Sequence, residues 1–138
     1  MQTLGRGFFF ALSKKQKLVT KSSTEAEFVS LSEHLGQATW SGDFCKEQGF
    51  DVGTPIIAQD NQSTIAMVKN GRPTSERTRH IKIRYFFVAD KVKTGEVKIV
   101  YVNTLDMVAD FATKPLQGAA FRRIRDLIMG VTICDIYK

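Results

Sequence analysis

Cysteine is scarce in this chain, and long apolar runs are scarce as well. The two cysteines, Cys45 and Cys134, lie far apart and in no metal-ligand spacing, so neither a disulfide scaffold nor a zinc site is expected. The longest early apolar run covers only residues 8–12, which is too short to span a bilayer or to form the core of a signal peptide. These absences predict a soluble, intracellular protein that is not secreted and has no membrane partner.

The length and the charge of the chain limit the class of protein that it can be. With 138 residues, of which 43% are hydrophobic and ten are phenylalanine, the chain can bury one core and suits one domain. Lysine and arginine number 20 against 14 aspartates and glutamates, which gives a net charge of +6. A basic balance favours a polyanionic partner, nucleic acid first. A lysine excess on a solvated surface explains the same number, so charge alone leaves both interpretations open.

Apolar periodicity and turn residues predict alternating strands and helices. Strands are expected at residues 7–12, 17–20, 55–60 and 96–102, with a polar hairpin turn at 13–16 between the first two. Helices are expected at residues 24–48, 62–70, 81–95, 104–113 and 118–129, and the tail 131–136 is strand-like. The hairpin would supply an antiparallel pair and the helical crossovers a parallel pair. The expected fold is therefore an α/β sandwich with a mixed sheet.

Asp60 ends an apolar strand and precedes a helix. In open α/β sheets, ligand sites form at the carboxyl ends of such strands. An aspartate in the same place also serves as the N-cap of the following helix. The sequence alone leaves both roles open for Asp60.

Two glutamates lie near the start of the first long helix. Glu27 is four residues before Leu31, so both share a helix face at the edge of the core stripe. Glu25 is rotated by about 200° from Glu27 and faces elsewhere. Ser22-x-x-Glu25 and Thr24-x-x-Glu27 both fit a capping box. Because Ser22, Thr24 and Glu25 suffice to start the helix, Glu27 is better placed for another role.

Asp110 is expected on the helix 104–113 between apolar neighbours, one turn after Asp106, which is close enough to the N-terminus to cap it or meet its dipole. A carboxylate in the position of Asp110 needs a partner or a metal. If Glu27, Asp60 and Asp110 cluster, they would bind hard divalent cations through oxygen. Two such ions clamp the attacking and leaving oxygens of a phosphodiester.

Four blocks of this sequence resemble the ribonuclease H domain of copia-type LTR retrotransposon polyproteins, in the same order and spacing from about Thr3 to Gly130. The blocks are "SKKQKLVTKSSTEAEFVSL", "QDNQSTIAMVKNG", "ERTRHIKIRYFFVADKVKTGEVKIVYVNT" and "MVADFATKPLQGAAFRRIRDLIMG". The resemblance implies a ribonuclease H-like three-layer sandwich, a mixed sheet flanked by helices, over residues 1–130. Residues 131–138 would be a C-terminal extension.

The resemblance also implies a function and a site. The implied activity is metal-dependent endonucleolytic cleavage of the RNA strand of RNA–DNA hybrids during retrotransposon reverse transcription. It implies a two-ion site of Mg²⁺ or Mn²⁺ held by Glu27, Asp60 and Asp110. The implied partners are the hybrid and the reverse transcriptase domain of the same polyprotein, in a cytoplasmic particle or the nucleus.

In the family that this chain resembles, a first strand carrying a further aspartate precedes the segment "TLGRGFFFAL", and this chain begins after that strand. Without it, the sheet is expected to have a gap, and backbone groups beside the gap would lose partners. Three explanations stay open: a chain cut from a longer polyprotein, a degraded and inactive element, or replacement of the strand by the tail "VTICDIYK" with Asp135 as the substitute aspartate. The fold prediction is therefore a sandwich whose first strand is missing or replaced.

Basic residues form two candidate contacts for nucleic-acid phosphates. The first is Lys14 and Lys15 in the expected hairpin, and the second is Arg77, Arg79 and His80 in "ERTRH". Solvated basic surfaces would have the same composition. Trp40 is interpreted as helix packing rather than a platform for base stacking. The alternative functions are a catalytically inactive fragment that keeps the fold and a basic nucleic-acid-binding surface, a structural subdomain of a reverse transcriptase, and a transposase or resolvase of similar fold.

Overall fold

The computed structural model describes residues 1–4, 6–70 and 79–132, with the backbone but not the side chains of 79–81. The chain divides into two compact units, which we name by their place in the sequence. The central unit is Gln16–Tyr101, and the terminal unit joins Met1–Lys15 to Val102–Lys138. In the described ranges, no helix has the length and apolar character needed to cross a membrane.

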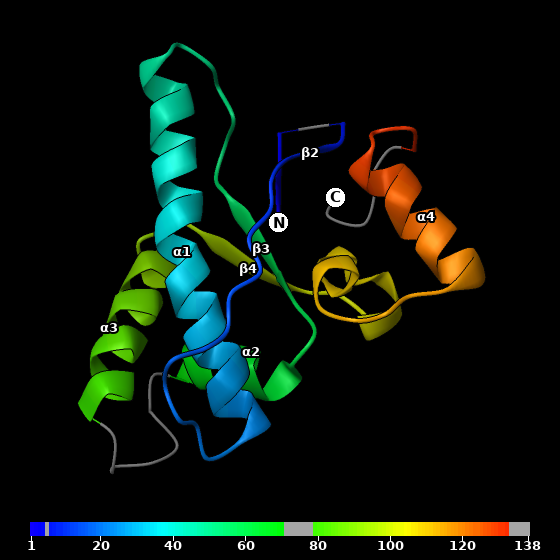
Figure 1. Cartoon of the computed structure of the whole chain (residues 1–138). Helices are drawn as coiled ribbons and strands as arrows, with labels where there is room; N and C mark the ends of the chain where they lie inside the picture. The colour runs from blue at the N-terminus through cyan, green and yellow to red at the C-terminus, as the bar shows by residue number, and fades with distance from the viewer. Residues whose placement is uncertain (5, 71–78, 133–138) are drawn as a thin grey trace. The chain divides into compact units, whose positions relative to one another are not determined.

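The central unit combines three helices with a parallel pair of strands. Along the chain these are α1 (Ser23–Glu47), β3 (Ile56–Gln59), α2 (Gln62–Asn70), α3 (Arg79–Lys93) and β4 (Lys98–Tyr101). β3 and β4 pair in parallel, with Ile56 opposite Lys98 and Gln59 opposite Tyr101. The long helix α1 lies beside α3, as Figure 1 shows. All five elements were predicted, within a few residues at each end.

The core of the central unit forms where α1, α2 and α3 turn their apolar faces inward. Phe28 of α1 is fully buried and its ring lies 6.1 Å from that of Tyr85 of α3. The other buried members of this cluster are Leu31, Leu35, Met67, Val68, Val88 and Val97. Leu31 and Leu35 belong to the apolar stripe predicted for α1. Gly49, with φ of +84°, ends α1 as predicted: its N–H and that of Phe50 donate to the carbonyls of Lys46 and Cys45.

Tyr85 has a hydroxyl group in this core without a hydrogen-bond partner among the described residues. Burial raises the pKa of Tyr85 above its usual value. A buried hydroxyl that lacks a partner loses its hydration without compensation. Tyr85→Phe is therefore expected to leave the free energy of unfolding unchanged or to raise it by up to about 1 kcal/mol. Urea denaturation of both proteins measures this, and a loss of more than about 1 kcal/mol would show that the hydroxyl has a stabilising partner.

The terminal unit contains an antiparallel strand pair and a short helical region. β1 (Gln2–Thr3) pairs with β2 (Phe8–Phe10), and the later segment forms the 3-10 turns η1 (Thr104–Asp106) and η2 (Val108–Ala112) and the helix α4 (Gly118–Ile128). Its buried core is Val108, Ile124 and Leu127.

Gly7 and Gly130 allow the start of this unit to approach the end of α4. Gly7 has φ of +73°, and a Cβ atom there would lie 3.1 Å from the carbonyl oxygen of Ile128. A Cβ atom at Gly130 would lie 3.1 Å from the backbone nitrogen of Gly7. A side chain at either position would therefore strain the backbone and also push the two segments apart.

The α/β class is confirmed, since the described residues form four α-helices and both kinds of strand pair. The resemblance predicts a sheet with a gap, and the described residues form two separate two-stranded sheets, one antiparallel and one parallel. The assignment of residues 1–130 to one domain stays a prediction. Residues 133–136 of the strand-like tail lie outside the described residues.

The predicted hairpin between residues 7–12 and 17–20 is wrong in its partner. β2 pairs with β1, across a short loop closed by a hydrogen bond from the Thr3 hydroxyl to the Gly7 carbonyl. Residues 13–16 are not a hairpin turn, and residues 17–20 form no strand. Alternation of polar and apolar residues predicts a strand but does not identify its partner, so it could not show that β2 pairs with the two residues of β1.

Candidate functional site

The end of β3 and the start of α2 carry Asp60. Asn61, and not Asp60, caps α2: its side-chain oxygen accepts from the Thr64 N–H at 3.0 Å. The Asn61 N–H in turn donates to the buried Gln59 side chain at 3.0 Å. Asp60 is half-buried between them, and its carboxylate has no hydrogen bond or ion pair with any residue that the structure describes. The capping role left open for Asp60 is thus filled by its neighbour.

The start of α1 resolves the two capping boxes seen in the sequence. Ser22 is the N-cap, and its hydroxyl accepts from the Glu25 N–H at 3.2 Å. The Glu25 carboxylate accepts from the Lys21 N–H at 2.8 Å. Glu25 therefore stabilises the start of α1, as predicted. Glu27, two residues later on the same helix, is exposed. Thr24, which a second capping box would require as N-cap, is inside the helix.

A buried threonine joins these two helix starts. The Thr64 side chain is fully buried, and its hydroxyl donates to the Thr24 carbonyl at 3.3 Å. Glu27 follows Thr24 by three residues, and Asp60 precedes Thr64 by four. The fold of the central unit thus brings together the helix starts that carry Glu27 and Asp60. The positive ends of α1 and α2 meet here, which favours anionic groups.

Asp110 belongs to the terminal unit, and the helix predicted around it is wrong. Residues 104–113 form η1 and η2, separated by Met107 in an extended conformation. Met107 and Val108 are both buried at this break, and burial of two apolar side chains favours it. The Asp110 carboxylate is mostly buried and accepts from the Lys114 ammonium at 2.8 Å. The partner that a carboxylate needs in this position is therefore a lysine.

Asp106 was expected to cap a helix or to interact with its dipole. In the structure its carboxylate forms an ion pair with Arg123 of α4. Arg123 also reaches the Leu105 carbonyl at 3.4 Å, so this arginine joins η1 to α4 rather than only facing solvent. Sequence reasoning missed this contact, since nothing in the spacing of 17 residues indicates it.

The candidate phosphate-binding lysines and arginines are placed only in part. Lys14 and Lys15 are exposed and lie in irregular backbone, not in a hairpin. Arg77 lies outside the described residues, and Arg79 and His80 begin α3 with side chains that are not described. Asp135, the candidate substitute aspartate, also lies outside the described residues.

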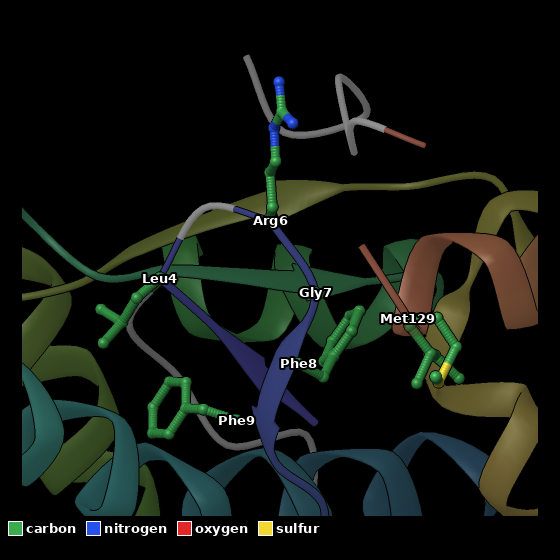
Figure 2. A pocket seen from close by; sticks show the side chains of 7 residues that line it. Leu4, Arg6, Gly7, Phe8, Phe9 and Met129 are labelled. Atoms are coloured by element: carbon green, nitrogen blue, oxygen red, sulfur yellow. The ribbon is translucent and has the colours of Figure 1, made fainter. Parts of the chain in front are cut away.

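The structure also has a hollow of about 390 Å³ in the terminal unit, which Figure 2 shows. Polar and apolar atoms line it about equally, and the Arg6 side chain points away from the other labelled residues. None of the candidate carboxylates lines it; the lining residues are Leu4, Arg6, Gly7, Phe8, Phe9, Ile128 and Met129. Among the described residues, no three histidine, cysteine, aspartate or glutamate side chains are grouped so that they could hold a metal ion.

The fold and these element ends define a mixed α/β protein with carboxylates where a strand ends and a helix begins. The chain is homologous to a short segment of retrotransposon Pol polyproteins. The retrovirus-related Pol polyprotein from transposon RE1 of Arabidopsis thaliana is 38% identical over 121 residues, which cover 87% of this chain and 8% of that protein. That from transposon RE2 of the same plant is 37% identical over 111 residues, covering 80% and 8%. That from transposon TNT 1-94 of Nicotiana tabacum is 31% identical over 116 residues, covering 84% and 9%.

The chain therefore spans less than a tenth of the length of these three relatives. No family model matches the chain. No solved structure matches it either.

Proposed function

We propose that this chain is a ribonuclease H module of a retrotransposon Pol polyprotein. It would hydrolyse the RNA strand of an RNA–DNA hybrid inside the cell, beside the reverse transcriptase domain of the same polyprotein. The observation that carries this proposal is the carboxylate of Asp60. It stands at the carboxyl end of β3, where α/β proteins build their sites, and Asn61 rather than Asp60 caps the next helix.

The carboxylates present suit a hard divalent cation, because Mg²⁺ and Mn²⁺ prefer oxygen ligands. Asp60, half-buried and with no described partner, offers such oxygens, and Glu27 comes from the adjoining helix start. The resemblance implies Asp110 as a further ligand, a role for which its carboxylate would have to leave the Lys114 ammonium. Divalent ions bound there would neutralise phosphate charge and make water a better nucleophile.

The remaining residues of the site would bind and orient the substrate. The paired starts of α1 and α2 present positive helix ends toward a phosphate group. Lys14 and Lys15 would bind phosphates along the hybrid, together with Arg77, Arg79 and His80, and the net charge of +6 favours the polyanion.

A second candidate is a module that binds the hybrid without cutting it. The observation that favours it is the pairing of Asp110 with Lys114, together with the lack of a three-carboxylate group among the described residues. Binding would then depend on the basic surface alone and would not require a divalent ion.

Cleavage of an end-labelled RNA–DNA hybrid, with Mg²⁺ or Mn²⁺ against EDTA, tests the proposal with a matched pair of variants. Glu27→Gln is expected to reduce metal-dependent cleavage about 100-fold. Glu25→Gln, two residues away, is expected to keep cleavage and to lose up to about 1 kcal/mol of stability, because its carboxylate holds the Lys21 N–H.

Equal cleavage by the two variants would refute the role of Glu27. A folded chain that binds the hybrid equally well in EDTA and never cuts it would establish the binding module instead. Fluorescence polarisation with a labelled hybrid measures that binding separately from cleavage.

A further inference from the structure

The positive charge of this chain is concentrated near its start. Residues 1–24 contain five lysines and arginines and no aspartate or glutamate. Taking these five from the 20 basic residues of the whole chain leaves 15 basic and 14 acidic residues in 25–138, a net charge of only +1 there. The excess that favours a polyanionic partner therefore belongs to one short stretch rather than to the surface as a whole. The five residues are Arg6, Lys14, Lys15, Lys17 and Lys21.

The last part of this stretch, residues 16–21, is fixed to the start of α1 at both of its ends, and we call it the anchored segment. The Gln16 side chain donates to the Ala26 carbonyl at 3.1 Å. The Lys21 N–H donates to the Glu25 carboxylate at 2.8 Å. Figure 1 shows the anchored segment beside the first turns of α1. A segment that is held at two points loses less conformational freedom when a ligand binds to it.

Side chains of the anchored segment alternate between half-buried and exposed. The exposed ones are Lys17, Val19 and Lys21. Neither lysine forms an ion pair with another residue that the structure describes, whereas five other lysines and arginines pair with carboxylates. The anchored segment therefore presents two ammonium groups, without a described counter-ion, on a backbone that is held in place.

The anchored segment borders the candidate metal site, because Ala26, to which Gln16 donates, immediately precedes Glu27 on α1. A nucleic-acid strand with one phosphate at Glu27 would bring further phosphates along this border. We propose that Lys17 and Lys21 bind phosphates of the RNA–DNA hybrid beside the cleavage site, and that Gln16 is a positioning residue that holds them there. This inference rests on the proposed ribonuclease H function and extends it, since it states where the substrate backbone is held.

Fluorescence polarisation with a labelled RNA–DNA hybrid in EDTA, at a series of salt concentrations, tests the two lysines without any cleavage. Each phosphate contact contributes about 0.7–0.9 to the slope of log Kd against log salt concentration. Lys17→Gln and Lys21→Gln are each expected to lower this slope by about one and to weaken binding at least about threefold. Lys98→Gln is the matched control and should leave both unchanged, because Lys98 is exposed but lies at the end of the β3–β4 pair opposite to Asp60.

A double-mutant cycle tests the positioning role of Gln16. Gln16→Met keeps the length of the side chain and removes the donor to the Ala26 carbonyl, without changing the charge of the chain. It is expected to weaken binding of the hybrid about threefold in the original chain and to have no effect in the double variant Lys17→Gln, Lys21→Gln. An equal loss in both backgrounds would show that Gln16 does not act through the lysines, and the positioning role would be wrong.

The outcomes separate this inference from the proposed cleavage. A chain that binds the hybrid through these lysines but never cuts it would refute the nuclease and support the inference. A chain that cuts the hybrid, while both lysine variants keep the original salt slope, would do the reverse.

A chain that does not bind the hybrid, or that loses as much affinity with Lys98→Gln, also overturns the inference. If the lysine variants lost binding to phosphatidylserine vesicles and kept binding of the hybrid, the anchored segment would be a membrane contact instead. Circular dichroism verifies that each variant is folded before its binding is compared.

Discussion

Asp60→Asn is expected to lower metal-dependent cleavage of an RNA–DNA hybrid on the order of 10³-fold while leaving stability within about 0.5 kcal/mol of the original. The amide keeps the size of the carboxylate but removes its charge, so it is a much weaker ligand for a hard cation. Stability should not change, because the Asp60 carboxylate contacts no described hydrogen-bond or ion-pair partner whose loss would cost free energy. The rate of cleavage and the urea midpoint, measured on the same preparation, separate the two effects.

The adjacent residue provides the reciprocal control. Asn61→Ala removes the side-chain oxygen that accepts from the Thr64 N–H at 3.0 Å, and loss of an N-cap costs about 1 kcal/mol. It should retain cleavage under conditions where the protein is folded. If instead Asp60→Asn lost stability and kept cleavage, Asp60 would be a structural residue and the proposed site would be wrong.

The contrast between Asp60 and Asn61 shows what the sequence could and could not predict at this site. The apolar run before Asp60 and the turn residues after it were sufficient to place it at a strand end. Both Asp60 and Asn61 are good N-cap residues, and a shift of one residue decides which of them caps α2. The three-dimensional positions of Gln59 and Thr64 determine which residue is the cap. The Asn61 N–H donates to the Gln59 side chain, and the Asn61 side-chain oxygen accepts from the Thr64 N–H.

At α1 the sequence was more informative. Ser22 and Glu25 fit the start of a helix through local spacing alone, and their contacts are local hydrogen bonds. The end at Gly49 was equally predictable, because glycine adopts the positive φ of a helix end without strain. Elements that depend on local interactions were thus predicted within one residue.

The errors arose where distant residues decide the structure. The partner of β2 is β1, and no local pattern distinguishes that pairing from one with residues 17–20. Met107 and Val108, at the break between η1 and η2, are both buried, and the Asp106–Arg123 pair joins residues that are 17 positions apart. The lysine partner of Asp110 is only four residues away, a spacing that favours an ion pair on a helix, but Lys114 lies one residue beyond the helix predicted at 104–113.

Phe28→Ala is expected to reduce the free energy of unfolding of the central unit by about 3–5 kcal/mol. Phe28 is fully buried, its ring lies 6.1 Å from that of Tyr85, and it belongs to the cluster that joins α1 to α2 and α3. Truncation removes buried apolar area and leaves a cavity that the surrounding helices can fill only in part. A domain of this size has about 5–15 kcal/mol of stability in total, so this substitution should bring the unit close to unfolding at 37 °C or below.

Phe50→Ala is the matched control, since it is the same chemical change at a side chain that is 66% exposed in the same unit. It should cost no more than about 0.5 kcal/mol. Urea denaturation followed by Trp40 fluorescence reports on the central unit, because α1 carries this tryptophan. Equal losses in the two variants would mean that Phe28 does not anchor the packing of α1. A loss confined to Phe28→Ala would instead identify the helix that carries Glu27 as the element on which the stability of the candidate site depends, since Thr24, which meets Thr64, lies one turn before Phe28 on the same helix.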